Sequence, residues 1–126
     1  MSGLNRLITE FRANTLATVQ ITGTDNELQE LPQPRSMALF HICQEALANI
    51  AKHAKAKQVD ISLWSTEARL LMEIHDNGKG FEMETTNATI GHGLANMQTR
   101  ARAVGGDVDI SSVIGEGTTV LAWVPR

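Results

Sequence analysis

Apolar and polar positions along the chain follow two spacings, one typical of helices and one typical of strands. Apolar residues three and four positions apart mark one face of a helix, whereas alternation sends every second side chain to one face of a strand. Helical spacing predicts helices over residues 3–13, about 35–54 and 93–104. Alternation predicts strands over residues 15–22, 58–64, 69–76, 107–113 and 117–124.

Glycine and proline mark the boundaries between these elements. Residues 23–34 hold turn formers and two prolines, which predicts a loop. Pro34 suits the first turn of the next helix, where its missing N–H costs nothing. Gly105 and Gly106 follow the third helix as a C-terminal stop signal.

The order of these elements predicts an α+β fold. Strands joined by short turns pair antiparallel, and helices that bury one side cover such a sheet on one face. We therefore expect a two-layer α/β sandwich, with a mixed, mainly antiparallel sheet of about five strands covered on one face by about three helices. The uncovered face should be mostly polar, and it should present Ser62, Trp64, Glu73, His75, Asp109 and Trp123. The two tryptophans either meet a further segment or are isolated exposed aromatics, and the second reading is favoured because it is common.

Length and charge restrict the class of protein. The 126 residues suit a single domain, residues 1–126. The net charge of −3, without a basic cluster, argues against a nucleic-acid binder, which needs a Lys/Arg face. The single cysteine, Cys43, is expected to be buried and cannot form an internal disulfide. No apolar run approaches the ~20 residues that span a bilayer, and no signal peptide is evident, so we expect a cytoplasmic domain.

Three glycine-containing segments follow one another along the second half of the chain. They are Asp76-Asn77-Gly78-Lys79-Gly80-Phe81, Gly91-His92-Gly93-Leu94 and Gly115-Glu116-Gly117-Thr118. Glycine permits positive φ and a close approach of the backbone to a ligand, and a helix N-terminus presents free N–H groups to phosphate. The second segment is expected to open the third helix, after a stretch, 82–90, that is either a short lid or a plain loop. Together the segments indicate a nucleotide pocket, although the third alone reads as a hairpin turn.

Asp76 is expected to point toward the helices, because it shares strand parity with the apolar residues 70, 72 and 74. A carboxylate in an apolar layer is costly unless it is hydrogen-bonded, and an adenine amino group would meet that need. The alternative, favoured on this residue alone, is an Asp that caps local N–H groups in a hairpin-end turn. A calcium loop is disfavoured because its ligand pattern is absent.

A polar stripe on the second helix consists of His41, Glu45, Asn49 and His53, each four residues apart, with Lys52 beside it. The stripe is either the solvated edge of the helix or the wall of a site. Zinc is disfavoured because the two histidines are twelve residues apart. Mg²⁺ fits better, because it takes oxygen ligands and keeps several waters, so one Asn carbonyl and phosphates can hold it.

In order and spacing these motifs resemble the ATP-binding Bergerat fold shared by gyrase, the ninety-kilodalton heat-shock chaperone, histidine kinases and MutL. Residues 44–54 look like the N box of sensor histidine kinases, Asp76–Phe81 like their G1 box, and Gly91–Leu94 like their G2 box. The Lys52-His53-Ala54 ending and the brief lid resemble the nitrate-sensor and desaturase-thermosensor subgroup. The resemblance covers roughly residues 15–125.

The resemblance implies an ATP site made by residues of all three boxes and the last glycine turn. Its members would be Asn49, Lys52, His53, Asp76, Gly78, Gly80, Phe81, Gly91, His92, Gly93, Leu94 and Thr118. Asp76 would contact the adenine amino group, and Gly78 and Gly80 would shape the base pocket. Gly91, Gly93 and Leu94 would form the phosphate cradle, and His92 would reach phosphate or serve the fold.

Three residues of the N box would be catalytic by the same resemblance. Asn49 would hold the Mg²⁺ that bridges the phosphates, and Lys52 would lie near the phosphates. Glu45 would orient the waters of the metal or assist proton transfer, and His53 would lie beside the base or ribose. The implied cofactors are thus ATP and Mg²⁺.

The implied reaction is transfer of the γ-phosphoryl group to a histidine on a separate dimerisation domain. Residues 1–14, read as the remnant of a linker, are too few for the two long helices of such a domain, and none of the four histidines has the acceptor's context. The implied partners are that dimerisation/phosphoacceptor domain and a response regulator, with no nucleic acid, and the isolated domain is expected to be monomeric. Whether the parent protein is membrane-anchored stays open.

Three other functions remain as alternatives. The first is an ATPase like gyrase or MutL, with Glu45 as the general base that activates water. The second is an ATP-dependent protein-binding module such as an anti-sigma serine kinase. The third is an interaction domain that binds no nucleotide.

Overall fold

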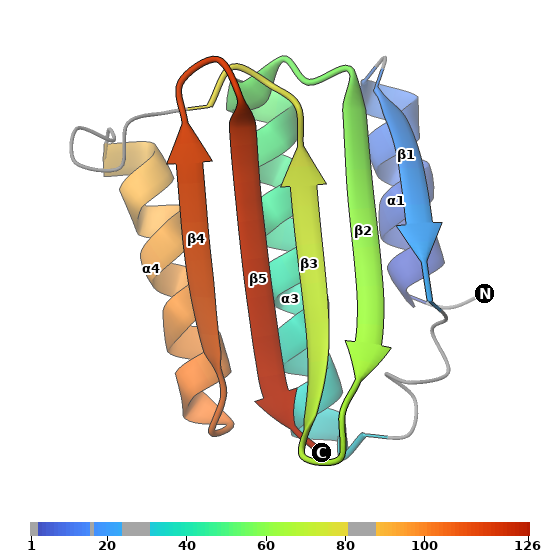
Figure 1. The fold of residues 1–126 in the computed structure, drawn as a ribbon, viewed down its shortest axis with the longest axis vertical. Coiled ribbons are helices and arrows are strands. Elements are labelled where there is room, and N and C mark those ends of the chain that lie inside the picture. The colour runs from blue at the N-terminus through green and yellow to red at the C-terminus, as the bar shows by residue number, and fades with distance from the viewer. Residues whose placement is uncertain (1–2, 16, 24–30, 81–87) are drawn as a thin grey trace.

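A computed structural model describes residues 3–15, 17–23, 31–80 and 88–126 of the chain. Figure 1 shows two layers, a sheet in front and helices α1, α3 and α4 behind it. In chain order the elements are α1 (Gly3–Asn14), β1 (Thr18–Thr22), α3 (Gln33–Asn49), the π-helix η1 (Ile50–Ala54), β2 (Gln58–Ser65), β3 (Arg69–Asp76), α4 (Ala88–Ala103), β4 (Asp107–Val113) and β5 (Gly117–Pro125). The expected α+β sandwich and its order of elements are confirmed.

The sheet has five strands in the order β1-β2-β3-β5-β4. β1 and β2 are parallel, and a parallel pair needs a crossover connection, which α3 supplies. The β2–β3, β3–β5 and β4–β5 pairs are antiparallel. The sheet is therefore mixed and mainly antiparallel, as the short turns between consecutive strands predict.

The core lies between the sheet and the helices. Each strand contributes alternate residues to it, so Leu70, Met72 and Ile74 of β3 are all 1% exposed. From α3, Leu39, Ile42 and Cys43 are fully buried against this layer, which confirms the expected burial of the cysteine. The burial of Cys43 raises its pKa to about 12.

Helix α1 belongs to the same core. Its apolar residues Leu4, Leu7, Ile8 and Phe11 are all buried in the main cluster. The guanidinium of Arg12 donates a hydrogen bond of 2.7 Å to the carbonyl oxygen of Val19 in β1. The origin of residues 1–14 as a linker remnant stays a prediction, but the apolar residues of α1 belong to the same core as the sheet and α3.

Two helix starts differ from the prediction. Helix α3 begins at Gln33 instead of Arg35, with Pro34 in its first turn as expected. Helix α4 begins at Ala88 instead of 93, so Gly93 lies inside the helix and not at its start. A glycine inside a helix costs only about 1 kcal/mol relative to alanine, so it does not by itself end the helix. The rest of the segment 82–90, and with it the lid, lies outside the described residues.

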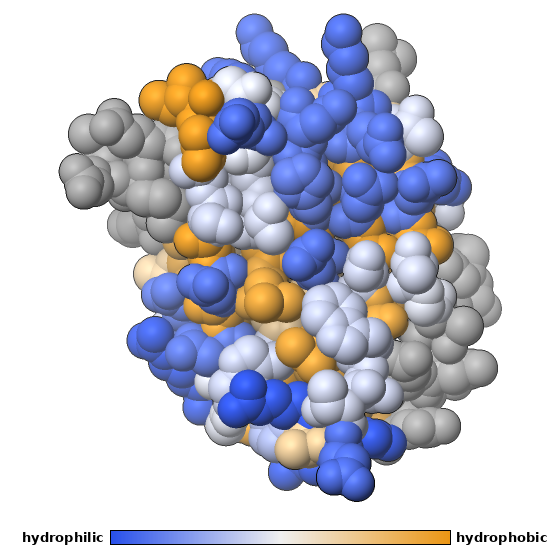
Figure 2. Space-filling model, viewed as in Figure 1, coloured by the Kyte–Doolittle hydropathy of each residue, from blue (hydrophilic) through white to orange (hydrophobic). Residues whose placement is uncertain are grey.

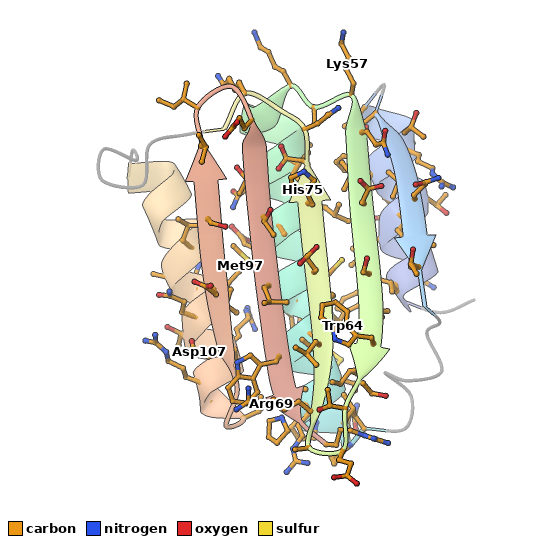
Figure 3. The ribbon with its side chains drawn as sticks, viewed as in Figure 1. Lys57, Trp64, Arg69, His75, Met97 and Asp107 are labelled. Atoms are coloured by element: carbon orange, nitrogen blue, oxygen red, sulfur yellow. The ribbon has the colours of Figure 1, made fainter. Side chains whose placement is uncertain are left out.

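The open face of the sheet is mostly polar, as expected, and Figure 2 shows small apolar areas among hydrophilic ones. Trp64 is 38% exposed there. The Arg69 guanidinium lies 3.8 Å from the ring centroid of Trp123, which covers part of that second tryptophan. Figure 3 places Trp64 and Arg69 toward one end of the sheet and His75 toward the other. Within the described part of the chain, no helix is both long and apolar enough to cross a membrane.

Candidate functional site

One row of residues crosses the end of the sheet on the side that faces the helices. Asp76 of β3 lies opposite Val59 of β2 on one side and Thr118 of β5 on the other. Thr118 in turn lies opposite Ser112 of β4. Directly opposed residues project from the same face of a sheet, and Val59 and Asp76 are buried. The row Asp76–Thr118–Ser112 therefore faces inward.

Asp76 is 2% exposed, and it is the one buried polar residue among those that the structure describes. Its Oδ1 accepts a hydrogen bond of 2.8 Å from the backbone N–H of Gly78. Burial raises the pKa of this carboxyl, and the N–H of Gly78, the charge of His75 and the N–H of Thr118 lower it by less. The expected inward direction is thus confirmed, and a local capping contact is present as well. Because its pKa remains raised, the ionised Asp76 carboxylate would be stabilised by a further hydrogen-bond donor.

Two glycine turns lie against each other beside Asp76. Gly80 has φ +66° and Gly117 has φ +102°, a region that favours glycine. A Cβ on Gly80 would collide with the carbonyl oxygen of Val113, and one on Gly117 with that of Asp76. The N–H of Gly115 donates a hydrogen bond of 2.7 Å to the carbonyl oxygen of Lys79. The first and third glycine segments, some 35 positions apart in the sequence, therefore form one end of the domain (Figure 1).

Gly93 brings the second glycine segment to the polar stripe of α3. A Cβ on Gly93 would lie 2.5 Å from Oε1 of Glu45 and 3.1 Å from Nδ2 of Asn49. Only a residue without a side chain lets α4 approach these two polar groups so closely. The structure thus gathers Glu45 and Asn49 at Gly93, and their partial burial distinguishes them from a fully solvated helix edge.

The Glu45 carboxylate and the Asn49 amide oxygen suit a hard cation such as Mg²⁺. Both lie in the cradle that a Cβ on Gly93 would fill. Among the described side chains, no three His, Cys, Asp or Glu residues form a metal-binding group. A Mg²⁺ ion here would share its coordination with waters and phosphates, which is the usual arrangement for this ion.

The end of the N box differs from a regular α-helix. Lys52 and His53 lie in the π-helix η1, which is followed by Lys55 in the left-handed conformation at φ +51°. π-helical turns are rare and frequently occur at functional sites. Lys52 is exposed, and the side chain of His53 is outside the described part.

Asn77, which the sequence did not mark as a site residue, ties this segment to the Asp76 turn. Its Oδ1 accepts hydrogen bonds of 2.9 Å from the backbone N–H groups of Lys57 and Gln58. Its own N–H donates a bond of 3.2 Å to the carbonyl oxygen of Gln58. An Asn side chain that bonds to distant backbone leaves no local signal in the sequence.

Four of the expected site residues are only partly described or not described. Phe81 lies outside the described residues. Gly91 and His92 lie in the helical backbone of α4, and the side chain of His92, like that of His53, is outside the described part. Leu94 is half-buried and packs against the core, so it helps to hold α4 against the rest of the domain.

Known proteins with similar sequences include several sensor kinases. The sequence profile of a family described as histidine kinase-, DNA gyrase B-, and HSP90-like ATPase matches residues 35–126. The sensor histidine kinase LiaS of Bacillus subtilis is 35% identical over 123 residues, which cover 98% of this chain and 33% of that protein. The sensor histidine kinase YdfH of the same organism is 42% identical over 88 residues, 68% of this chain and 22% of that protein. The chain thus spans a third or less of the length of these relatives.

A solved structure shares the fold. It is the histidine kinase domain from the Erythrobacter litoralis EL346 blue-light activated histidine kinase, with a TM-score of 0.72 and 18% sequence identity. The alignment covers 97% of this chain and 58% of that one. At this identity the similarity concerns the fold alone, and it extends across the whole sandwich, α1 included.

Proposed function

The chain belongs to the family of histidine kinase-, DNA gyrase B- and HSP90-like ATPases, and from this premise we propose that it is the catalytic domain of a two-component sensor kinase. In this proposal the domain binds Mg-ATP and donates the γ-phosphoryl group to a histidine on a dimerisation domain outside this chain. The observation that supports it most is the buried Asp76 carboxylate beside the glycine turns, with Glu45 and Asn49 gathered at Gly93.

Asp76 would recognise the adenine base. Its carboxylate accepts backbone N–H groups from Gly78 and Thr118, but burial outweighs these contacts and raises its pKa, so the surrounding layer disfavours its charge. An amino group on the base is a donor without charge, so it satisfies the carboxylate and leaves the pocket apolar. Gly80, with its positive φ, lets the Asp76 turn pack against the backbone of Val113, and this packing would shape the base pocket beside Asp76.

Glu45, Asn49 and Lys52 would serve the phosphates. Phosphoryl transfer depends mainly on positioning and on the neutralisation of charge. The Asn49 amide oxygen would ligate Mg²⁺, and Glu45 would orient a metal-bound water from the adjacent helical turn. When bound, Mg²⁺ neutralises charge on the phosphate oxygens. Lys52, exposed in η1, can extend toward the phosphates as a mobile cation.

The partners follow from the relatives. LiaS and YdfH are named sensor histidine kinases, and the DegS protein of Brevibacillus brevis, 34% identical over 97 residues, is named a signal transduction histidine-protein kinase/phosphatase. We therefore assign a phosphoacceptor domain of the same kinase and a response regulator as partners. The nitrate-sensor-like subgroup and the monomeric state of the isolated domain stay predictions.

Titration calorimetry with Mg-ATP tests the proposal. We expect the domain to bind Mg-ATP and Asp76→Asn to lose at least about 100-fold in affinity, because a site built around a hydrogen bond rejects the mismatched group strongly. Asp109→Asn, which makes the same change on the open face of the sheet, is the matched control and should leave the affinity unchanged. Equal affinities of Asp76→Asn and the parent domain would refute the assignment of Asp76.

Glu45 also allows a second candidate function, an ATPase in which this residue is the general base. Its Oε1 lies at the Gly93 cradle, where it could activate water. Steady hydrolysis of ATP by the isolated domain, abolished in Glu45→Gln, would favour this candidate. Transfer of phosphate to an added dimerisation domain, with little hydrolysis in its absence, would favour the sensor kinase.

A further inference from the structure

The backbone corner between the N box and β2 has an unusual conformation, and the proposed function gives no role to the side chain that holds it. The N box ends in the π-helix η1, and Lys55 directly after it has φ +51°. Left-handed backbone is disfavoured for a residue other than glycine, and π-helical turns are rare. Conformations of this kind persist where surrounding groups hold them. At this corner, one such group is the side chain of Asn77.

The Asn77 side chain joins the corner to the turn that follows β3. Its Oδ1 accepts the backbone N–H groups of Lys57 and Gln58, each at 2.9 Å, although Lys57 lies 20 positions earlier in the sequence. An amide oxygen has two lone pairs, so these two bonds use both. The N–H of Asn77 also donates a bond of 3.2 Å to the carbonyl oxygen of Gln58. The end of the N box is therefore attached to the Asp76 turn two residues after Lys55.

The two ends of the proposed site depend differently on this attachment. Asp76 is paired with Val59 on one side and Thr118 on the other, and its carboxylate accepts the N–H of Gly78. These contacts hold the base end without the Asn77 side chain. Lys52, by contrast, lies in η1 itself and is exposed. Loss of the Asn77 side chain should therefore loosen the phosphate end and leave the base end in place.

We infer that Asn77 is a positioning residue that acts through Lys52: it fixes the end of the N box against the Asp76 turn, so that Lys52 is directed at the phosphates of a nucleotide whose base is held at Asp76. This inference rests on the proposed function. A lysine side chain loses rotamer freedom when it binds phosphate. Mobile backbone beneath the lysine adds to that cost, whereas fixed backbone lowers it.

The test compares Mg-ATP with adenosine monophosphate, which keeps the base and ribose but lacks the β- and γ-phosphates. Calorimetry gives both dissociation constants, directly for Mg-ATP and by displacement for the monophosphate. Their ratio measures what the phosphate end adds to affinity. We expect this ratio to fall roughly three- to tenfold in Asn77→Ala, about the effect of one lost hydrogen bond.

Thr66→Ala is the matched control for a general loss of stability. The Oγ1 of Thr66 accepts the backbone N–H of Arg69 at 3.1 Å, in the exposed turn between β2 and β3 at the other end of the sheet. The substitution thus also removes a side-chain oxygen that holds a backbone corner. The ratio should stay unchanged in Thr66→Ala.

Two further variants separate positioning from a structural role. Asn77→Asp retains an oxygen that can accept both N–H groups, and it should restore most of the ratio in 0.15 M salt, which screens the added charge at this exposed position. In a Lys52→Ala background, Asn77→Ala should change the ratio little further, because the group through which Asn77 acts is gone. An undiminished further fall in that background would overturn the action through Lys52.

The outcome for the inference is separable from that for the proposed function. An unchanged ratio in a folded Asn77→Ala domain that still binds Mg-ATP would overturn the inference alone, and so would an equal loss of affinity for both nucleotides. If Asn77→Ala does not fold, Asn77→Ser, which keeps a polar but shorter side chain, takes its place with the same expected fall. A parent domain that binds neither nucleotide would overturn the proposed function and the inference together.

Discussion

Two adjacent pairs on β3 and β5 each place an ionisable residue opposite a threonine, and they lie on opposite faces of the sheet. His75 lies opposite Thr119 on the open face, and their Nδ1 and Oγ1 atoms are 2.8 Å apart. Asp76 lies opposite Thr118 on the buried face. In the outer pair, the two side chains are hydrogen-bonded to each other. In the inner pair, Thr118 is bonded to Ser112 and Asp76 to backbone.

The contrast separates a structural pair from a binding pair. A side chain that bonds to its neighbour across the strands has used its capacity for hydrogen bonds locally. In the inner pair the Thr118 hydroxyl is bonded to the Ser112 hydroxyl and the Asp76 carboxylate to backbone N–H groups, and a carboxylate has more acceptor sites than these bonds use. Burial makes that capacity costly for Asp76, as its raised pKa indicates. A residue held at a cost in the folded state is typical of a functional site.

The largest expected effect is a loss of stability when the backbone contact between Gly117 and Asp76 is disturbed. Gly117→Ala places a Cβ against the carbonyl oxygen of Asp76, at a φ of +102°. We expect it to lower the free energy of unfolding by about 2–4 kcal/mol, measured by urea denaturation. Gly115→Ala is the control, since it also has a positive φ, +85°, but its Cβ would meet nothing within 4 Å. A loss of only about 1 kcal/mol is expected for Gly115→Ala. Equal losses in the two variants would contradict the close packing of Gly117 against the Asp76 carbonyl.

The paired threonines give the next largest effect. Thr118→Val and Thr119→Val remove the same hydroxyl from neighbouring positions on opposite faces of β5. We expect Thr118→Val to weaken Mg-ATP binding about tenfold, because an acceptor beside the base is lost. Thr119→Val should change the affinity by less than about twofold. Calorimetry on both variants decides the comparison, and similar affinities would mean that the face of the sheet has no bearing on binding.

The cost of burying Asp76 should be visible in stability. Because burial raises the folded-state pKa above the usual 3.8, the folded protein holds the proton more tightly than the unfolded chain. The free energy of unfolding therefore falls as pH rises from 3.8 through the raised pKa. We expect ligand-free Asp76→Asn to melt a few degrees above the parent domain at pH 7, and this gain to shrink as pH falls toward 3.8. Thermal melts of both proteins at several pH values measure this difference. If Asp76→Asn is less stable than the parent domain at pH 7, burial of the Asp76 charge does not destabilise the fold.

The smallest effect should come from the outer pair. His75→Asn removes the contact with Thr119, which is worth about 0.5–1.5 kcal/mol as a single hydrogen bond. Its affinity for Mg-ATP should stay within about twofold of the parent domain. Urea denaturation and calorimetry on the same variant measure both quantities. A large loss of affinity with unchanged stability would move His75 from the structural pair to the site.

Most of the fold could be predicted from the local pattern of the sequence. The five strands and three helices occur in the predicted order, and the strand ends differ by three residues or fewer. The start of α4 was predicted five residues too late, because glycine is a boundary signal only where the chain must leave the helix. At Gly93 the residue serves a contact between helices instead, and that contact involves Glu45, which lies 48 positions earlier in the chain.

By itself the sequence determined the inward direction of Asp76, because strand periodicity is a property of the local backbone. It also determined which residue types the site contains, and their order resembles that of the kinase family. Only the tertiary structure decided which of these groups meet: Gly93 with Glu45 and Asn49, and Asp76 with Thr118 and then Ser112. The physical reason is register, since the pairing of strands and the packing of α4 on α3 are set by the whole core and not by any one segment.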